Sequence, residues 1–253
     1  MVDRLIPDLT TRNIRNAGDS FRRLQQEIRG WDVVIWEDDF LGDAIDTRYP
    51  AVATGVDGSF DASATGISGV ATLDVGDGAT SGDDEYGGQP LGNLEWQGDL
   101  NAFTVARIKI SDITTVKVEF GFTDALTDAG AVNDLATPTV TATDCAVWCL
   151  DTDDTATWQA VSANAGTAGK SENSSIVAPV NDTYQYLGVF LEGDNVIFKQ
   201  WDASGAKVGE DIVLDSGIEG GTAVAPWLFV QNRAATIDRV VTIDYVMTGQ
   251  RRS

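Results

Sequence analysis

Carboxylates are the side chains best able to do chemistry in this sequence, because histidine is absent from all 253 residues. Without imidazole, the serine-histidine-aspartate and cysteine-histidine nucleophile systems, histidine-containing zinc sites and imidazole pH switches are excluded. The 39 acidic residues leave carboxylate-based acid and base catalysis open. Retaining glycosidases use two such groups about 5 to 5.5 Å apart. A glycosidase site therefore requires a pair of acids on one face of the protein, while chemistry by tyrosine or lysine also stays open.

Two pairs of carboxylates lie in short strand-like segments. They are Glu95 with Asp99 in LEWQGDL and Glu119 with Asp124 in VEFGFTD. Side chains alternate between the two faces of a strand, so an odd separation puts Glu119 and Asp124 on opposite faces. A glycine interrupts the segment between Glu95 and Asp99. We therefore predict no catalytic residues and no enzymatic activity.

Cys145 and Cys149 are the only cysteines, and they lie in the stretch CAVWCLDTDDTATWQAVSANAG, residues 145–166. Four residues of a strand span about 13 Å, beyond the roughly 7 Å between Cα atoms that a disulfide tolerates. Two ligands are also too few for a structural zinc site. We predict two strands around the acidic turn DTDDT, with both thiols buried on the face that also carries Val147.

Acidic residues also cluster in the segment 74–93, which lacks the spacing of an EF-hand loop. A solvated acidic loop is the favoured interpretation, so we predict no metal site and no cofactor. The alternative is calcium held by Asp74, Asp77, Asp83, Asp84 and Glu85.

The charge distribution limits the partners. The whole chain carries −22, and residues 1–30 carry +2, which leaves −24 for residues 31–253. A body this negative repels nucleic acid phosphates and anionic membranes. The sequence also contains no apolar run of about 18 residues, and we expect no secretory leader. We therefore expect neither nucleic acid nor a membrane as partner.

The first thirty residues are predicted to form a helical arm. Five apolar residues recur at the 3,4,3,4 spacing that places them on one stripe of an amphipathic helix. They are Ile14, Ala17, Phe21, Leu24 and Ile28. Five arginines lie mostly elsewhere on this helix: Arg12, Arg15, Arg22, Arg23 and Arg29. The stripe packs either on the chain's own β domain or on another surface; we predict the second and assign these ten residues to assembly or docking.

From residue 31 onward, short apolar or alternating runs are separated by glycine, aspartate, asparagine, serine and threonine, which is typical of an all-β sandwich. The runs cover residues 33–36, 103–110, 115–122, 145–150, 186–193, 196–201, 211–214, 227–232 and 240–247. GDN at 193–195 and DASG at 202–205 are predicted hairpin turns. Residues 52–69 and 74–93 have little regular pattern and are expected to be loops or weak edge strands. The prediction is an arm at 1–30 and a two-sheet antiparallel β-sandwich at 31–253.

Several segments resemble those of concanavalin A-like jelly-roll domains in virion proteins of tailed bacteriophages. They are EDDFLGD (37–43), VKVEFGFTDA (116–125), the 145–166 stretch, TYQYLGVFLEGDNVIFKQWD (183–202) and VQNRAATIDRVVTIDYVMTG (230–249). The resemblance covers about residues 36–249. It implies a capsid decoration or cement protein in the virion, which binds the major capsid protein through the arm and self-associates, with a homotrimer favoured.

Two other functions stay open. Glucanases share this fold and carry a Glu-x-Asp-x-x-Glu cluster on one strand; this chain lacks the cluster, so a glycan-cleaving enzyme is the least favoured interpretation. The alternative is a glycan-binding head- or tail-fibre component with a lectin-like jelly roll. Seven tryptophans are present, and an indole face stacks on sugars. Because they lie beside turns, Trp158 and Trp201 are the candidate glycan contacts.

Overall fold

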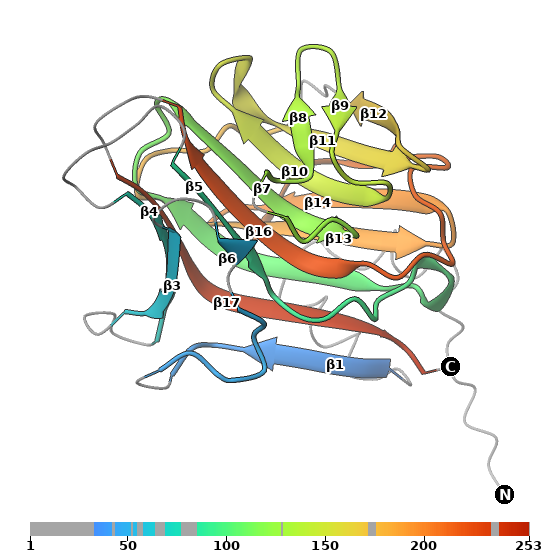
Figure 1. Cartoon of the computed structure of the whole chain (residues 1–253), viewed down its shortest axis with the longest axis horizontal. Helices are drawn as coiled ribbons and strands as arrows, with labels where there is room; N and C mark the ends of the chain where they lie inside the picture. The colour runs from blue at the N-terminus through green and yellow to red at the C-terminus, as the bar shows by residue number, and fades with distance from the viewer. Residues whose placement is uncertain are drawn as a thin grey trace, which may run out of the picture.

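The protein folds into two antiparallel sheets packed face to face (Figure 1). The computed structural model describes residues 33–41, 44–51, 53–54, 58–63, 69–76, 85–127, 129–171, 176–233 and 238–252. The predicted arm at residues 1–30, with its ten docking residues, lies outside the described residues and stays a prediction. Within the described residues, no helix has the length and apolar character that a membrane crossing needs.

The larger sheet has eight strands in the order β15-β14-β13-β6-β17-β4-β3, with β1 also paired to β17. Their bounds are β1 Val33–Asp38, β3 Gly58–Ala62, β4 Ala71–Val75, β6 Phe103–Ile110, β13 Gln185–Glu192, β14 Asn195–Trp201, β15 Lys207–Leu214 and β17 Arg239–Arg251. The long β17 pairs with β4 through its first half and with β1 through its second half. The first and last described strands therefore lie side by side, as Figure 1 shows.

The smaller sheet has seven strands in the order β12-β11-β10-β7-β16-β5-β2. Their bounds are β2 Ala53–Thr54, β5 Tyr86–Pro90, β7 Val116–Thr123, β10 Cys145–Asp151, β11 Thr155–Asn164, β12 Thr167–Ser171 and β16 Ala225–Asn232. A separate hairpin consists of β8 Val132–Asp134 and β9 Thr139–Val140, and η1 Gly98–Leu100 is a single 3-10 turn. The predicted all-β, two-sheet antiparallel sandwich is confirmed.

The core lies between the sheets and follows the alternation predicted for β6 and β10. Ala106 and Ile108 of β6 face the smaller sheet, and Ala146, Trp148 and Leu150 of β10 face the larger one. The Trp148 indole N–H donates to the carbonyl of Gly188 across the sandwich, with 3.1 Å between nitrogen and oxygen. Burial of these apolar side chains supplies most of the energy that holds the two layers together.

Regular alternation of inward and outward side chains along β17 stops at Ile243. A β-bulge inserts one extra residue, Asp244, opposite β6, so that the two faces exchange. Val246 consequently faces the core, whereas Met247 packs on the outside of the larger sheet. Asp244 forms an ion pair with Arg107 of β6, which gives the bulge a charged partner on the outer face.

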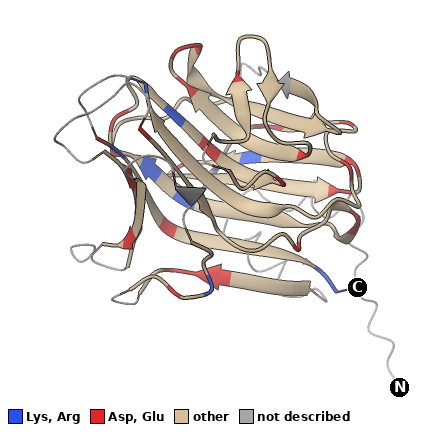
Figure 2. Ribbon diagram, in the orientation of Figure 1, with Lys and Arg blue, Asp and Glu red and all other residues tan. Residues whose placement is uncertain are grey.

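Acidic side chains are spread over the loops and strands, and Figure 2 shows few basic residues among them. Several of these basic residues are held in ion pairs. Lys199 and Lys207 both contact Asp211, and Arg233 contacts Asp151. The described residues contain many more acidic than basic residues, as the composition predicts.

Candidate functional site

The outer face of the smaller sheet is the first candidate site, because charged and aromatic side chains meet on its central strands. Lys117 and Glu119 project from β7, and Trp227 and Phe229 project from β16 beside them. The ammonium of Lys117 lies 3.1 Å from the carboxylate of Glu119, and the two side chains are only 2% and 0% exposed. A buried acid at the centre of a sheet is suited either to catalysis or to anchoring, and its partners decide between these roles.

The partners of Glu119 come from the hairpin segment, residues 129–142, which lies over this face. Glu119 Oε2 accepts the N–H of Ala131 at 2.7 Å, and Oε1 accepts the N–H of Val132 at 3.0 Å. The Trp227 indole donates to Oε2 at 3.3 Å, and Lys117 also donates to the carbonyl of Val132. The carboxylate thus has three N–H donors and an ammonium around it. This bonding makes Glu119 an anchor for the hairpin segment.

The same hairpin segment covers the two thiols. Cys145, Val147 and Cys149 share the outer face of β10, as predicted, and form one apolar cluster with Val132 and Leu135. Both cysteines are free and fully buried. Burial raises the pKa of each thiol well above its ordinary value, and nearby carboxylates add to this effect. Because the thiolate is the nucleophile and metal-binding form, these cysteines are chemically inert in the folded protein.

Part of this face stays open beside the hairpin segment. A hollow of about 230 Å³ lies there, and its lining combines aromatic, amide and cationic side chains: Tyr86, Lys117, Ala129, Asn133, Phe229, Gln231 and Arg233. Arg233 is already engaged, because its Nε lies 3.1 Å from Asp151 Oδ1. The hollow can accept a small polar group, but it holds no pair of carboxylates.

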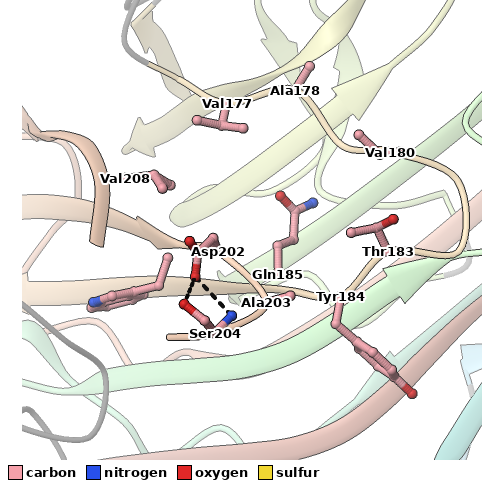
Figure 3. A pocket seen from close by; sticks show the side chains of 11 residues that line it. Val177, Ala178, Val180, Thr183, Tyr184, Gln185, Asp202, Ala203, Ser204 and Val208 are labelled. Carbon is pink, nitrogen blue, oxygen red and sulfur yellow. Dashed lines mark hydrogen bonds between the residues drawn. The ribbon is translucent and has the colours of Figure 1, made fainter. Parts of the chain in front are cut away.

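A second hollow, of about 350 Å³, lies where β13 begins and β14 ends (Figure 3). Its walls are mainly apolar: Val177, Ala178, Val180, Ala203 and Val208. Val177 and Val180 are 45% and 60% exposed, so this wall is open to solvent. The wall is tied to β14 by Gln200, whose amide binds both the N–H and the carbonyl of Val177.

Two polar side chains, Gln185 and Asp202, line this second hollow (Figure 3). Gln185 Oε1 accepts a hydrogen bond from Gln200 at 3.1 Å. Asp202 Oδ1 accepts from the N–H and the hydroxyl of Ser204. The hydrogen bond from the Ser204 side chain is the main cause that lowers the pKa of Asp202. A buried amide and a carboxylate therefore stand at an apolar hollow, an arrangement suited to a small ligand with hydroxyl or carbonyl groups.

The two predicted glycan contacts do not offer an exposed ring. Trp158 lies in the core between the sheets, and Trp201 lies on the outside of the larger sheet, but both indoles are 0% exposed. The Trp201 ring covers Gly188, where an added Cβ would lie 2.9 Å from Cζ3. Stacking on a sugar requires an open indole face. Stacking through these two residues is therefore not supported, although Trp201 does line the second hollow.

The predicted acidic pairs take separate roles. Glu119 binds the hairpin segment, whereas Asp124 lies just after β7 and accepts the N–H of Thr143 at 3.0 Å. Asp99 belongs to η1, and Glu95 precedes it on an exposed segment. Sequence reasoning missed Lys117 and Trp227 as the partners of Glu119. The only signal was a lysine two residues before the acid, which places both on one face of a strand.

The suggested calcium ligands fall partly outside the structure. Asp74 lies in β4 and Glu85 is buried beside β5, while the other three acids lie outside the described residues. Among the residues that the structure describes, no three cysteine, aspartate or glutamate side chains are grouped so as to hold a metal ion.

Comparison with known proteins identifies the fold. No protein-family model and no curated protein sequence matches the chain. Among solved structures, a β-glucanase from Bacillus licheniformis superposes with a TM-score of 0.55 at 10% identity, and lectin II from Ulex europaeus with 0.54 at 9%; each covers 86% of this chain and 98% of the other. A protein of unknown function from Shewanella oneidensis MR-1 gives 0.53 at 10%, covering 86% of both chains. The chain is thus an all-β sandwich with the concanavalin A-like jelly-roll architecture of these lectins and glucanases.

Proposed function

We propose that this chain is a non-enzymatic structural protein of a bacteriophage particle, a capsid decoration protein. The observation that carries the non-enzymatic part is the bonding of Glu119, whose carboxylate is fully used in holding the hairpin segment over the smaller sheet. Fold alone does not convey function. The phage setting rests on the resemblance of residues 36–249 to virion proteins.

In this proposal the arm, residues 1–30, attaches to the major capsid protein, and the acidic sandwich projects from the shell. Self-association as a trimer multiplies weak contacts by avidity. The arm carries +2 on a chain of −22, so its arginines favour an acidic or polar shell surface. The virion is the site of action, and no cofactor takes part.

The proposal predicts that arm arginines decide capsid binding. We expect the Arg12→Glu, Arg23→Glu double variant to bind purified capsids of the encoding phage at least tenfold more weakly than wild type, since both substitutions reverse a charge at the contact. Cosedimentation with capsids that lack the protein measures this. Arg251→Glu, Arg252→Glu is the matched control, because it makes the same charge change at two exposed residues of the other terminus.

Two outcomes count against the proposal. If the arm variant and the C-terminal control bind capsids equally well, the arm does not mediate attachment. If mass spectrometry and antibody labelling find no wild-type protein in purified particles, the proposed decoration function is wrong.

A glycan-binding fibre component is the second candidate, favoured by the second hollow with Gln185 and Asp202. If it holds, a glycan array gives hits that Gln185→Leu loses, because the buried amide donor disappears. Asn164→Leu, a change of similar size at a half-buried amide away from the hollow, keeps the hits. An array without hits for wild type counts against this role.

A further inference from the structure

The outside of the larger sheet carries an apolar cluster that a solvated face would not have. We call it the outer-face cluster; it consists of Phe103, Val105, Phe190, Ile197, Trp201 and Met247. These side chains point away from the smaller sheet, yet none is more than 2% exposed. Burying each large apolar side chain is worth about 1.5 to 3 kcal/mol, so leaving the cluster in water would be costly.

The described strands account for only one margin of this cluster. Val33 and Ile35 of β1 pack against it, as do Tyr186 and Tyr245 of the larger sheet itself. β1 pairs with the last residues of β17 as a strand of the same sheet, as Figure 1 shows, so it does not cross the outer face. No other described strand crosses this face, because the smaller sheet lies on the opposite side of the larger one. The described strands thus give no cover to β6, β13 and β14 on this face.

Residues 1–32 are placed to supply that cover. They lead directly into Val33, whose side chain already contacts the cluster. The predicted helix from Ile14 to Ile28 is about 21 Å long at 1.5 Å per residue. The strands β14, β13, β6 and β17 span about 14 Å at 4.8 Å per spacing. A helix of this length can cross all four strands, with four residues, 29–32, left between its end and β1.

We propose that residues 12–29 bind the outer-face cluster of their own chain through Ile14, Ala17, Phe21, Leu24 and Ile28, in place of the packing on another surface that the sequence alone led us to predict. At about 100° per residue, Arg12 and Arg23 lie roughly 140 to 160° from the centre of this stripe. Docking of the stripe consequently leaves these arginines pointing away from the sheet. That they then face the shell rests on the proposed function; the docking itself does not.

The first experiment compares two variants, each with one new carboxylate, on opposite sides of the predicted helix. Phe21→Asp places it in the stripe, and the matched control Gln26→Asp places it about 160° away. We expect Phe21→Asp to lower the melting temperature by about 5 to 10 °C and to increase the fluorescence of Nile red several-fold, since the cluster becomes exposed. Nile red is uncharged, so the acidic body does not repel it. Gln26→Asp should behave as wild type; the same behaviour from Phe21→Asp overturns the proposal.

The second experiment locates the contact on the sheet. Phe21→Ala is combined with Ile197→Ala, on the outer face of β14, or with Val196→Ala, its neighbour on the inner face. We expect the melting-temperature losses to be less than additive with Ile197 and additive with Val196, because only residues in contact couple. Additive losses in both combinations overturn the proposal.

A dilution series distinguishes docking within one chain from docking between copies. Nile red fluorescence per wild-type chain that stays constant on dilution supports the proposal, and a rise on dilution overturns it in favour of a second copy. Failure of capsid binding would remove the proposed function while leaving all of these stability results unchanged.

Discussion

Replacing Glu119 with alanine is expected to lower the free energy of unfolding by about 3 to 5 kcal/mol. The change leaves the ammonium of Lys117, 2% exposed, without its carboxylate partner. It also removes the acceptor for the N–H groups of Ala131, Val132 and Trp227. Urea unfolding followed by far-ultraviolet circular dichroism measures the loss, with the slope of the transition showing whether the folded state stays compact.

The matched control for this prediction removes both charges. Lys117→Met combined with Glu119→Leu should recover much of the stability, because a buried ion pair is often replaceable by apolar residues of similar volume, whereas a lone buried charge is not. A loss below about 0.5 kcal/mol for Glu119→Ala, the range of an ordinary surface change, contradicts the anchoring role. Loss of a measurable glycan-cleaving activity in that stable variant would instead make Glu119 catalytic.

Trp148→Ala is expected to cost about 3 to 5 kcal/mol, the range for removing a large aromatic ring from a packed core. Its ring lies edge-to-face against Phe198 with 5.3 Å between centroids, and its N–H bonds to Gly188 on the opposite sheet. The variant therefore loses both packing and the hydrogen bond that joins the layers. Thermal and urea unfolding of the purified variant provide the measurement.

Trp148→Phe separates the two contributions. It keeps most of the ring volume but removes the donor, so its loss should be clearly smaller than that of the alanine variant. Wild-type stability for Trp148→Ala would be incompatible with a ring that is 1% exposed between two sheets.

Strands with strong alternation were predictable from the sequence. The β10 pattern places Cys145, Val147 and Cys149 on one side and Trp148 on the other, and the structure has the same division. The turns at 193–194 and 202–205 also lie where glycine, aspartate and asparagine indicate them. These features depend on local periodicity and on turn-forming residues, which neighbouring residues reveal.

β5 could not be predicted, because its glycines and proline are typical of a loop. The structure explains its composition: the Trp227 ring lies over Gly88, where an added Cβ would come within 2.2 Å of Cη2. The glycine is needed for a close aromatic contact between paired strands β5 and β16. The need for this glycine comes from a residue 139 positions away, so the residues next to Gly88 do not reveal it.

The bonding of Glu119 is equally nonlocal. Its carboxylate oxygens accept from two backbone N–H groups of the hairpin segment, 12 and 13 residues later in the chain, and from an indole N–H 108 residues later. Glu119 and Asp124 accept from different backbone N–H groups, those of Ala131 and Thr143. The sequence did not reveal why Glu119 is there, because the hairpin segment has only short strands and weak alternation.

The pairing of β1 with β17 has a practical consequence for fusion proteins. Val33 lies opposite Arg251, so the point where the arm joins the sandwich and the end of the last strand are neighbours. A domain fused after residue 252 would emerge about 5 Å, one strand spacing, from the base of the arm. Cargo fused at this terminus would therefore crowd the base of the arm, whereas cargo inserted in the 202–205 turn, at the end of β14, avoids that junction.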